Sequence, residues 1–514
     1  MARLYRVWGV VPAIGLCLVP LVAFGQPSAE GMSPAALQAL GQGDSAAKAH
    51  AADAIGDQGA KAKGAVGALA AALHDSDPAV RWHVARALGA IGPDAAPAVS
   101  SLTAALADKD AKVRAYSAYA LGEIGPAAKP ALSTLAGMIE DTDATVRREA
   151  IKALGKVGPH PEVVDALVDV LKKAPAAEVP PALHSLAEFG DAVVPDMIEA
   201  LDHEKARYWA CLVLAEIGPK AKEAVPALVK ALGDKRREVR REAVLALGHI
   251  GPGAAAAVPQ IVPLLDDQGG GVRSGSVWSL GAMGPAAQAA LPALKKKTAD
   301  PDEMLSMLCA WAIARIEPGD AVARGRAREK LLATTTSKQP RVRATAIFGL
   351  ADLKFHDPDV VHALVHALGD PDNQTAATAG QALVGMGDAA VGPLTESLSD
   401  EPLRGHAAAA LGTLGPRAKS ATGALVARLN DKNPEVRAET LYALGAIAPG
   451  DAQVLAAVSK SAASDTEPAV RYAAIEALSA AGAVARTALE AATRDKEPQV
   501  AAAAREALAR QAAR

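Results

Sequence analysis

The sequence predicts an all-α protein built from one repeating unit, and three observations lead to this prediction. Aromatic residues make up only 3% of the 514 residues, so small helix-forming side chains such as alanine must fill the core in place of large rings. A segment of 33 residues recurs along the chain. Each copy carries, at fixed positions, the residue types that begin and end helices.

Charge and cysteine content exclude several classes of protein. The chain has 54 Lys and Arg against 57 Asp and Glu residues, a net charge of −3, so no basic surplus points to nucleic acid. Hydrophobic residues make up 50% and charged residues 22%, which excludes an intrinsically disordered chain. Three cysteines are too few for a disulfide scaffold.

The N-terminus has the layout of a secretory signal peptide. Arg3 and Arg6 form a short positive region, and the apolar stretch 8–25 follows them. Ala23 and Gly25 then provide small residues before a cleavage point. We therefore expect an exported protein, either periplasmic or extracellular.

Two alternatives to cleavage stay open. Residues 8–24 could remain as a membrane anchor, although the apolar run is slightly short of about 20 residues and two prolines interrupt it. A lipoprotein signal would need a small residue before Cys17, where Leu16 stands. The expected domains are a signal peptide at 1–25, a polar lead-in and N-terminal cap at 26–43, and the repeats at 44–514.

The repeat is clearest where arginines 33 residues apart, Arg81, Arg114 and Arg147, each begin a V-R-x-x-A-x-x-A-L-G-x-I-G-P pattern. The pattern returns at residues 237–252, 270–285 and 434–449. About fourteen units follow residue 44. Each unit predicts two helices, a first helix of the pattern A-V-P-x-L and a second helix that begins near V-R. Asp77 is an expected N-cap, Pro78 fits the first helical position, and the Gly-Pro pair ends the second helix.

The motif D-x-x-x-x-V-R-x-x-A-x-x-A-L-G-x-I-G-P resembles the HEAT repeat family, specifically the short HEAT-like repeats of the phycobilisome-lyase type. The resemblance covers roughly residues 44–514. It implies a right-handed α-solenoid, or superhelix, of about fourteen stacked helix pairs. In such a solenoid the second helices line the concave face and the first helices line the convex face, and neighbouring pairs must stack because no single pair can bury its apolar face.

An aspartate stands six residues before the arginine in seven units. The pairs are 75/81, 108/114, 141/147, 234/240, 267/273, 431/437 and 465/471. The resemblance implies that these residues form a ladder that links the turns of adjacent repeats. Charge-assisted hydrogen bonds from the arginines would satisfy turn backbone groups and fix the register of the repeats.

The sequence gives no catalytic, metal-binding or cofactor-binding site. The catalytic relatives, deoxyhypusine hydroxylases, use several His-Glu pairs to hold two irons, and this chain has one such pair, His203-Glu204. His362 and His366 are four residues apart but lack a third ligand, which favours a solvated helix face. No residues identify a bilin site. We therefore expect no enzyme and no cofactor; a metal- or cofactor-dependent oxidoreductase or lyase, by analogy with the relatives, is the alternative.

The aromatic residues are the candidate binding residues. With each arginine as position zero, ten of the twelve aromatics after the signal segment occupy positions +1, +2 and +5, on the face opposite the repeat's own core. They are Trp82, Tyr116, Tyr119, Tyr208, Trp209, Trp278, Trp311, Phe348, Tyr442 and Tyr472. Exposed aromatics commonly anchor partners. Lateral packing between neighbouring second helices is the alternative, and the two are compatible.

The charges in the same columns, which include Arg86, Arg241 and Glu242, are of mixed sign and suit a protein or peptide partner better than a polyanion. The sequence thus predicts an exported, non-enzymatic scaffold that binds a protein or peptide along its concave face, with no nucleic acid, no identified small molecule, and a membrane only if the signal segment is retained. A purely structural spacer would leave the aromatic pattern unexplained.

Two further expectations concern irregular units and thiols. The units near 176–203 and 302–340 depart from the pattern, so we expect local changes in curvature there without a domain break. Cys211 and Cys309 fall in second helices three repeats apart, too far for a disulfide, and should be free and buried.

Overall fold

A computed structural model describes residues 34–512 of the chain. The expected signal peptide at 1–25 and the alternative anchor at 8–24 lie outside the described residues, as does the first part of the expected lead-in. Within residues 34–512 the secondary structure is helical throughout, with α-helices and short 3-10 helices and no strand. Fourteen pairs of a first and a second helix follow α2, so the prediction of an all-α solenoid of about fourteen pairs is confirmed.

The described residues form two compact units, 34–293 and 294–512, which we call the N-terminal and C-terminal units. The boundary lies within α17 (Leu291–Lys297), so the chain passes from one unit to the other inside a helix. The expected division into signal, lead-in and a single repeat array stays a prediction, as do the handedness of the superhelix and the changes in curvature.

In the N-terminal unit the second helices are α2 (Ser45–Gly56), α4 (Pro78–Ile91), α6 (Ala111–Ile124), α8 (Ala144–Val157), α10 (Val179–Glu188), α12 (Arg207–Ile217), α14 (Arg237–Ile250) and α16 (Gly270–Met283). The first helices, with their 3-10 segments, are α1 (Pro34–Gln42), η1 (Gly59–Ala65) with α3 (Val66–Ala72), η2 (Gly92–Ala98) with α5 (Val99–Ala105), η3 (Gly125–Ala131) with α7 (Leu132–Gly137) and η4 (Met138–Glu140), α9 (Pro161–Lys173) and η5 (Ala176–Glu178), η6 (Gly190–Val193) with α11 (Val194–Asp202), η7 (Gly218–Ala224) with α13 (Val225–Ala231), and η8 (Gly251–Ala257) with α15 (Val258–Ile261) and η9 (Val262–Asp266). The segment η10 (Gly284–Ala290) leads into α17.

In the C-terminal unit the second helices are α18 (Glu303–Ile316), α20 (Pro340–Asp352), α22 (Asn373–Met386), α24 (Arg404–Leu414), α26 (Pro434–Ile447), α28 (Pro468–Ala481) and α30 (Pro498–Ala512). The first helices are α19 (Ala321–Thr334), α21 (Pro358–His366) with η11 (Ala367–Gly369), η12 (Gly387–Ala390) with α23 (Val391–Ser397), η13 (Gly415–Ala421) with α25 (Thr422–Arg428), α27 (Ala452–Ser464), and η14 (Gly482–Ala485) with α29 (Arg486–Ala492).

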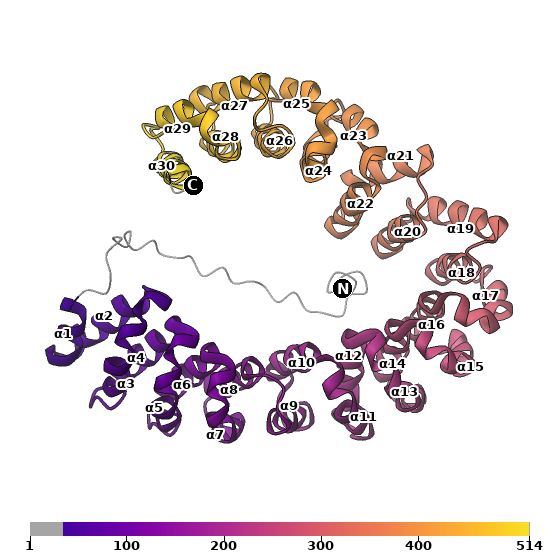
Figure 1. Ribbon diagram of the computed structural model, residues 1–514. Helices are drawn as coiled ribbons and strands as arrows, with labels where there is room; N and C mark the ends of the chain where they lie inside the picture. Colours follow the sequence, from indigo (N-terminus) through magenta and orange to yellow (C-terminus); the bar gives the residue numbers. More distant parts are fainter. Residues whose placement is uncertain (1–33, 513–514) are drawn as a thin grey trace. The chain divides into compact units, whose positions relative to one another are not determined.

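Within each unit, the second helices lie side by side in one row on the concave side, and the first helices form another row outside them (Figure 1). This is the arrangement that the sequence predicts for a solenoid. The apolar residues of each second helix, Leu88 in α4 and Leu121 in α6 among them, are fully buried as expected.

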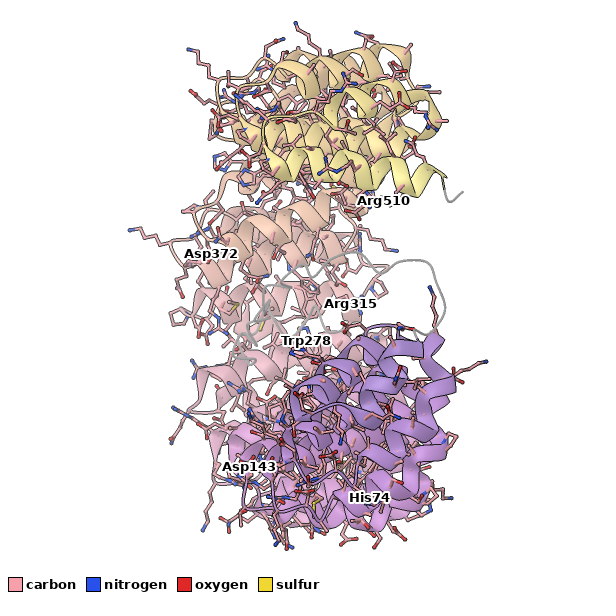
Figure 2. All side chains as sticks on the ribbon, turned by 90° about the vertical axis from the view of Figure 1, so that its left-hand side faces the viewer. His74, Asp143, Trp278, Arg315, Asp372 and Arg510 are labelled. Carbon is pink, nitrogen blue, oxygen red and sulfur yellow. The ribbon has the colours of Figure 1, made fainter. Side chains whose placement is uncertain are left out.

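The helix ends follow from local sequence. Asp143, labelled in Figure 2, caps α8 by accepting hydrogen bonds from the backbone N–H groups of Thr145 and Val146 at 2.7 and 3.2 Å. Gly125 ends α6 in the left-handed region at φ +72°, a conformation that costs glycine little. The chain then continues directly as a seven-residue 3-10 helix before α7. Most first helices likewise have two parts, a 3-10 segment followed by an α-helix. The sequence pattern predicts only the second of these parts.

Glycines set the spacing between second helices. A Cβ added to Gly56 would lie 2.9 Å from the Cα of Ala87, and one added to Gly122 would lie 2.9 Å from the Cα of Ala153. Gly122 stands eight residues after Arg114, and Gly56 stands eight residues after Lys48, which occupies the arginine position in its repeat. Each glycine faces an alanine of the next second helix. The backbones therefore approach more closely than any side chain would allow. In α10, Ala187 stands at this position, and α10 packs more sparsely on α12.

Candidate protein-binding surface

The arginine ladder fixes the second helices that carry the aromatic residues. Arg81 donates from Nε and Nη2 to the Asp108 carboxylate of the next repeat at 2.7 and 2.8 Å, and from Nη1 to the carbonyl of Asp75 at 2.9 Å. Equivalent ion pairs join Arg114–Asp141, Arg207–Asp234, Arg240–Asp267, Arg343–Asp370, Arg404–Asp431, Arg437–Asp465 and Arg471–Asp495. The expected ladder therefore links adjacent turns and satisfies turn carbonyls.

The ladder changes where the repeat is irregular. Glu178 takes the place of the aspartate and pairs with Arg147 at 2.6 Å. In the C-terminal unit Ser306 stands where arginine is expected, and its hydroxyl donates to the carbonyl of Thr298 at 2.7 Å. Ser337 stands at the next aspartate position and donates to Glu303 at 2.6 Å. The second helices α18 and α20 pack more sparsely here than α4 and α6 do.

The ten aromatic residues do not form one surface. Tyr442 and Tyr472 are exposed, at 44% and 39%. Six are half-buried: Trp82, Tyr116, Tyr119, Tyr208, Trp209 and Phe348. Trp278 and Trp311 are buried, with only 7% and 3% of their surface exposed. The expectation that these two tryptophans are available to a partner is therefore wrong.

Each of these two rings packs against a glycine of a neighbouring second helix; Tyr119 packs on Gly89 in the same way but stays half-buried. The ring of Trp278 lies against His249 of α14, with centroids 4.8 Å apart, and would come within 2.6 Å of a Cβ at Gly248. Trp311 lies beside Gly349 of α20 and donates from Nε1 to Asp352 at 2.9 Å. Both rings pack laterally between second helices, which is the alternative that the sequence left open.

The largest half-exposed aromatic group joins α4 and α6. The Trp82 and Tyr116 rings stack with centroids 5.2 Å apart, and Tyr119 meets Tyr116 edge-on at 6.4 Å. Lys112 Nζ lies 5.8 Å from the centroid of Trp82. These rings support each other laterally and still keep part of their surface exposed, so they combine both roles that the sequence suggests.

An acidic and basic group lies beside these rings, and the sequence analysis named only its Arg86. Asp53 of α2 accepts a hydrogen bond from His83 Nδ1 of α4 at 2.6 Å and forms an ion pair with Arg86 Nη2 at the same distance. Lys48 and Arg81 occupy the same ladder position in neighbouring repeats. Asp53 stands five residues after Lys48, and His83 and Arg86 stand two and five residues after Arg81. A comparison of neighbouring repeats at these positions could have found the group.

A second aromatic group lies on α12. Tyr208 and Trp209 meet edge-on with centroids 4.8 Å apart, and burial raises the pKa of the Tyr208 phenol.

On α14, Glu242 is expected to be exposed, but its side chain is only 2% exposed and pairs with Arg241 at 2.6 Å. Burial raises the pKa of Glu242 above the usual carboxyl range. This carboxylate is therefore part of the packing between helices and not of a free surface.

The histidines that the sequence singled out as possible metal ligands lie on the surface. His362 and His366 are exposed on α21, and His203 and Glu204 are exposed in a turn. Within residues 34–512 no three His, Cys, Asp or Glu side chains gather closely enough to hold a metal ion. Cys211 and Cys309 are free and buried, as predicted, and burial raises the pKa of Cys309 to about 12.

Residues 237–266 are apolar and long enough to cross a membrane by length and composition. In the structure this stretch contains α14, η8, α15 and η9, and more than half of it is buried inside the protein. Packing within the repeats therefore accounts for its apolar character.

The sequence matches the profile of HEAT repeats over residues 33–108, 99–187, 194–281, 328–412, 393–479 and 421–509. These segments cover most of the chain. The chain belongs to the HEAT repeat family. The HEAT-repeat match leaves residues 282–327 uncovered, and this stretch contains α17 and α18, where the ladder changes.

Among solved structures, this HEAT-repeat chain is similar to yeast importin-β (Kap95p), with a TM-score of 0.53 and 15% identity over 92% of this chain and 80% of that chain. It is also similar to a chain of the Kap95:Nup1 complex, with a TM-score of 0.54 and 14% identity over 92% of this chain and 82% of that one. At such low identity, the likeness shows a common solenoid fold. No curated protein matches the sequence.

Proposed function

We propose that this HEAT-repeat protein is an exported, non-enzymatic scaffold that binds a protein or peptide along the concave row of second helices. The observation that carries the proposal is the Trp82–Tyr116–Tyr119 group, whose rings are braced by one another and remain partly exposed. Aromatic anchors of this kind bury a large area at little cost in side-chain entropy. Mixed charges next to them, such as Lys112 and Asp53, suit polar groups of a polypeptide.

A partner-capture experiment tests this proposal. The mature protein is used to capture partners from the exported fraction, and the Trp82→Ala/Tyr116→Ala variant is compared with a Val484→Ala control, which removes an exposed side chain outside the row of second helices. We expect the double variant to lose at least about tenfold in affinity, since two anchors at about 2 kcal/mol each would contribute that much or more. Equal capture by all three proteins would contradict the proposal.

Export is part of the proposal, and it rests on the layout of Arg3, Arg6 and the apolar stretch 8–25. N-terminal sequencing of protein recovered from the producing cells should begin at Gln26. Protein that begins at the initiator region and sediments with membranes would favour the anchor formed by residues 8–24. We also propose that the repeats belong to the short HEAT-like subtype of the phycobilisome-lyase type, which the 33-residue spacing supports.

A further inference from the structure

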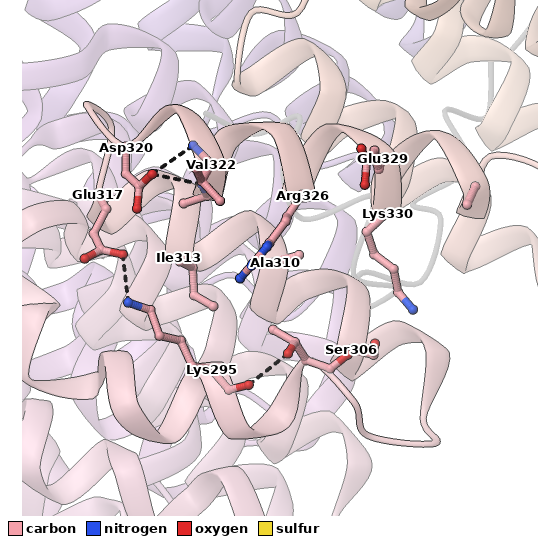
Figure 3. Close-up of a pocket in the computed structure, with 13 residues that line it drawn as sticks. Lys295, Ser306, Ala310, Ile313, Glu317, Asp320, Val322, Arg326, Glu329 and Lys330 are labelled. Carbon is pink, nitrogen blue, oxygen red and sulfur yellow. Dashed lines mark hydrogen bonds and ion pairs between the residues drawn. The ribbon is translucent and has the colours of Figure 1, made fainter.

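A groove of about 550 Å³ lies in the C-terminal unit where the repeat pattern is broken (Figure 3). Its floor is formed by Ala310 and Ile313 of α18, and one wall is α19. The other side is bounded by Lys295 of α17 and by Thr298 just after it. Because α17 and α19 are both first helices, the groove opens on the row of first helices and is separate from the concave surface described above.

The loss of the ladder arginine explains why the space is open. In other repeats a guanidinium extends from this position to the next turn, as Arg343 does to Asp370 at 2.6 Å. Ser306 is too short to cross, and its hydroxyl is held by the carbonyl of Thr298 in the preceding turn. Ser306 itself lines the groove, so the groove begins where the missing side chain would have been.

Two cations on the wall are unpaired within the described part of the chain. Arg326 and Lys330 are four residues apart on α19, line the groove, and form no hydrogen bond or ion pair with side chains of residues 34–512. On the other face of α19 the cations are engaged, since Arg324 donates to the carbonyl of Leu353 at 3.0 Å and Arg328 pairs with Asp357 at 3.2 Å. Unpaired cations are therefore confined to the side of α19 that faces the groove.

The carboxylates of the groove do not satisfy these cations. Asp320 caps α19 by accepting from the N–H groups of Val322 and Ala323 at 2.8 and 3.1 Å. Glu317 Oε2 lies 3.2 Å from Lys295 Nζ, an ion-pair distance without hydrogen-bond geometry, and this buried oxygen receives no hydrogen bond. Glu329 of α19 also lines the groove and is exposed, and it forms no ion pair with Arg326 or Lys330. A ligand would thus meet two cations, Arg326 and Lys330, that no carboxylate of residues 34–512 neutralises.

We infer that this groove is a second docking site, which takes an acidic peptide segment of a partner protein. An aliphatic side chain of the segment would lie on Ala310 and Ile313, and its carboxylates would pair with Arg326 and Lys330. A peptide offers an apolar side chain and two carboxylates together at this spacing, which is why it fits better than an anionic membrane surface or a free anion.

Fluorescence anisotropy tests this site directly. The probe is a fluorescein-labelled peptide of about 12 residues that carries two glutamates four residues apart with a leucine between them, and it is titrated with the full chain. The variant Arg326→Glu/Lys330→Glu should bind roughly tenfold more weakly. The control Lys419→Glu/Lys432→Glu makes the same change in net charge at exposed lysines elsewhere in the C-terminal unit and should stay within about twofold of the parent protein.

A second variant removes the groove without changing charge. Ala333 is exposed on the rim, so Ala333→Trp can fill the space and should abolish probe binding while the far-ultraviolet circular dichroism stays unchanged. The Trp82→Ala/Tyr116→Ala variant should still bind the probe, which separates this site from the proposed concave surface. The inference is overturned if the control loses as much affinity as the groove variant, or if Ala333→Trp binds normally. It is also overturned if vesicles with about 30 mol% phosphatidylserine bind the parent protein through Arg326 and Lys330 while the peptide does not.

Discussion

Replacing Gly122 by alanine tests the close packing of second helices in the solenoid. A Cβ at this position would lie 2.9 Å from the Cα and 3.1 Å from the Cβ of Ala153, and backbone atoms cannot move aside as a flexible side chain can. Overpacking of this kind costs about 1–3 kcal/mol, whereas alanine in a helix interior gains about 0.5–1 kcal/mol over glycine. The steric cost is larger, so we expect a net destabilisation of about 1–2 kcal/mol.

The matched control is Gly325→Ala in α19, where no atom lies within 4 Å of the added Cβ. Only the gain in helix propensity remains there, so this variant should be more stable by about 0.4–1 kcal/mol. Because repeat proteins can unfold in parts, the assay is hydrogen exchange measured helix by helix. Gly122→Ala should weaken protection in α6 and α8. Unchanged or stronger protection in those helices would refute the argument that glycine sets the helix spacing.

Three other predictions concern the ladder, the thiols and a buried ring. The Arg114 guanidinium holds the pKa of Asp141 below its ordinary value, so this pair stabilises the fold above the unfolded pKa of about 4 and the stabilisation is lost as pH falls further. Arg114→Gln should lower the urea midpoint at pH 7 and weaken the dependence of that midpoint on pH below 5. As a control, breaking the exposed pair Arg486–Glu490 should cost at most about 0.5 kcal/mol of stability. Equal losses of stability in the two variants would contradict a structural ladder. Cys211 and Cys309 should resist a thiol reagent in the native protein, and the mature protein should show two thiols after denaturation without reduction; fewer than two would disprove the free-thiol assignment. Trp278→Ala should lower stability by about 3–5 kcal/mol because it empties a packed site, and a loss within 0.5 kcal/mol in thermal melts would show that the ring is not part of the core.

Most of the fold could be predicted from the sequence because its signals are local. The caps at Asp77 and Asp143, the glycines that end second helices and the apolar face that buries Leu88 each depend on residues within one repeat. The ladder could also be predicted, since it repeats in register. The 3-10 part of most first helices was not predicted, although a G-P-x-A-x-x-A pattern recurs there with its buried alanines three residues apart.

The binding surface was harder to predict because exposure depends on a neighbouring repeat. Helical phase alone gives Trp278 and Tyr442 the same position, +5, yet Trp278 is buried and Tyr442 is exposed. Trp278 lies on Gly248 of the preceding second helix, whereas the corresponding Gly412 is covered by Ala443 and not by the tyrosine ring. A prediction of exposure therefore needs the packing geometry of the adjacent helix, which no single repeat contains.

The central claim is that a polypeptide partner lies along the second helices, and site-specific photo-crosslinking tests it most directly. A photoreactive amino acid replaces Tyr116 on α6 in one protein and Ala104, an exposed residue of the first helix α5, in another. Both proteins are irradiated in the presence of the partner captured from the exported fraction. We predict a crosslinked adduct from position 116 and none from position 104. An adduct from position 104 alone would contradict the account.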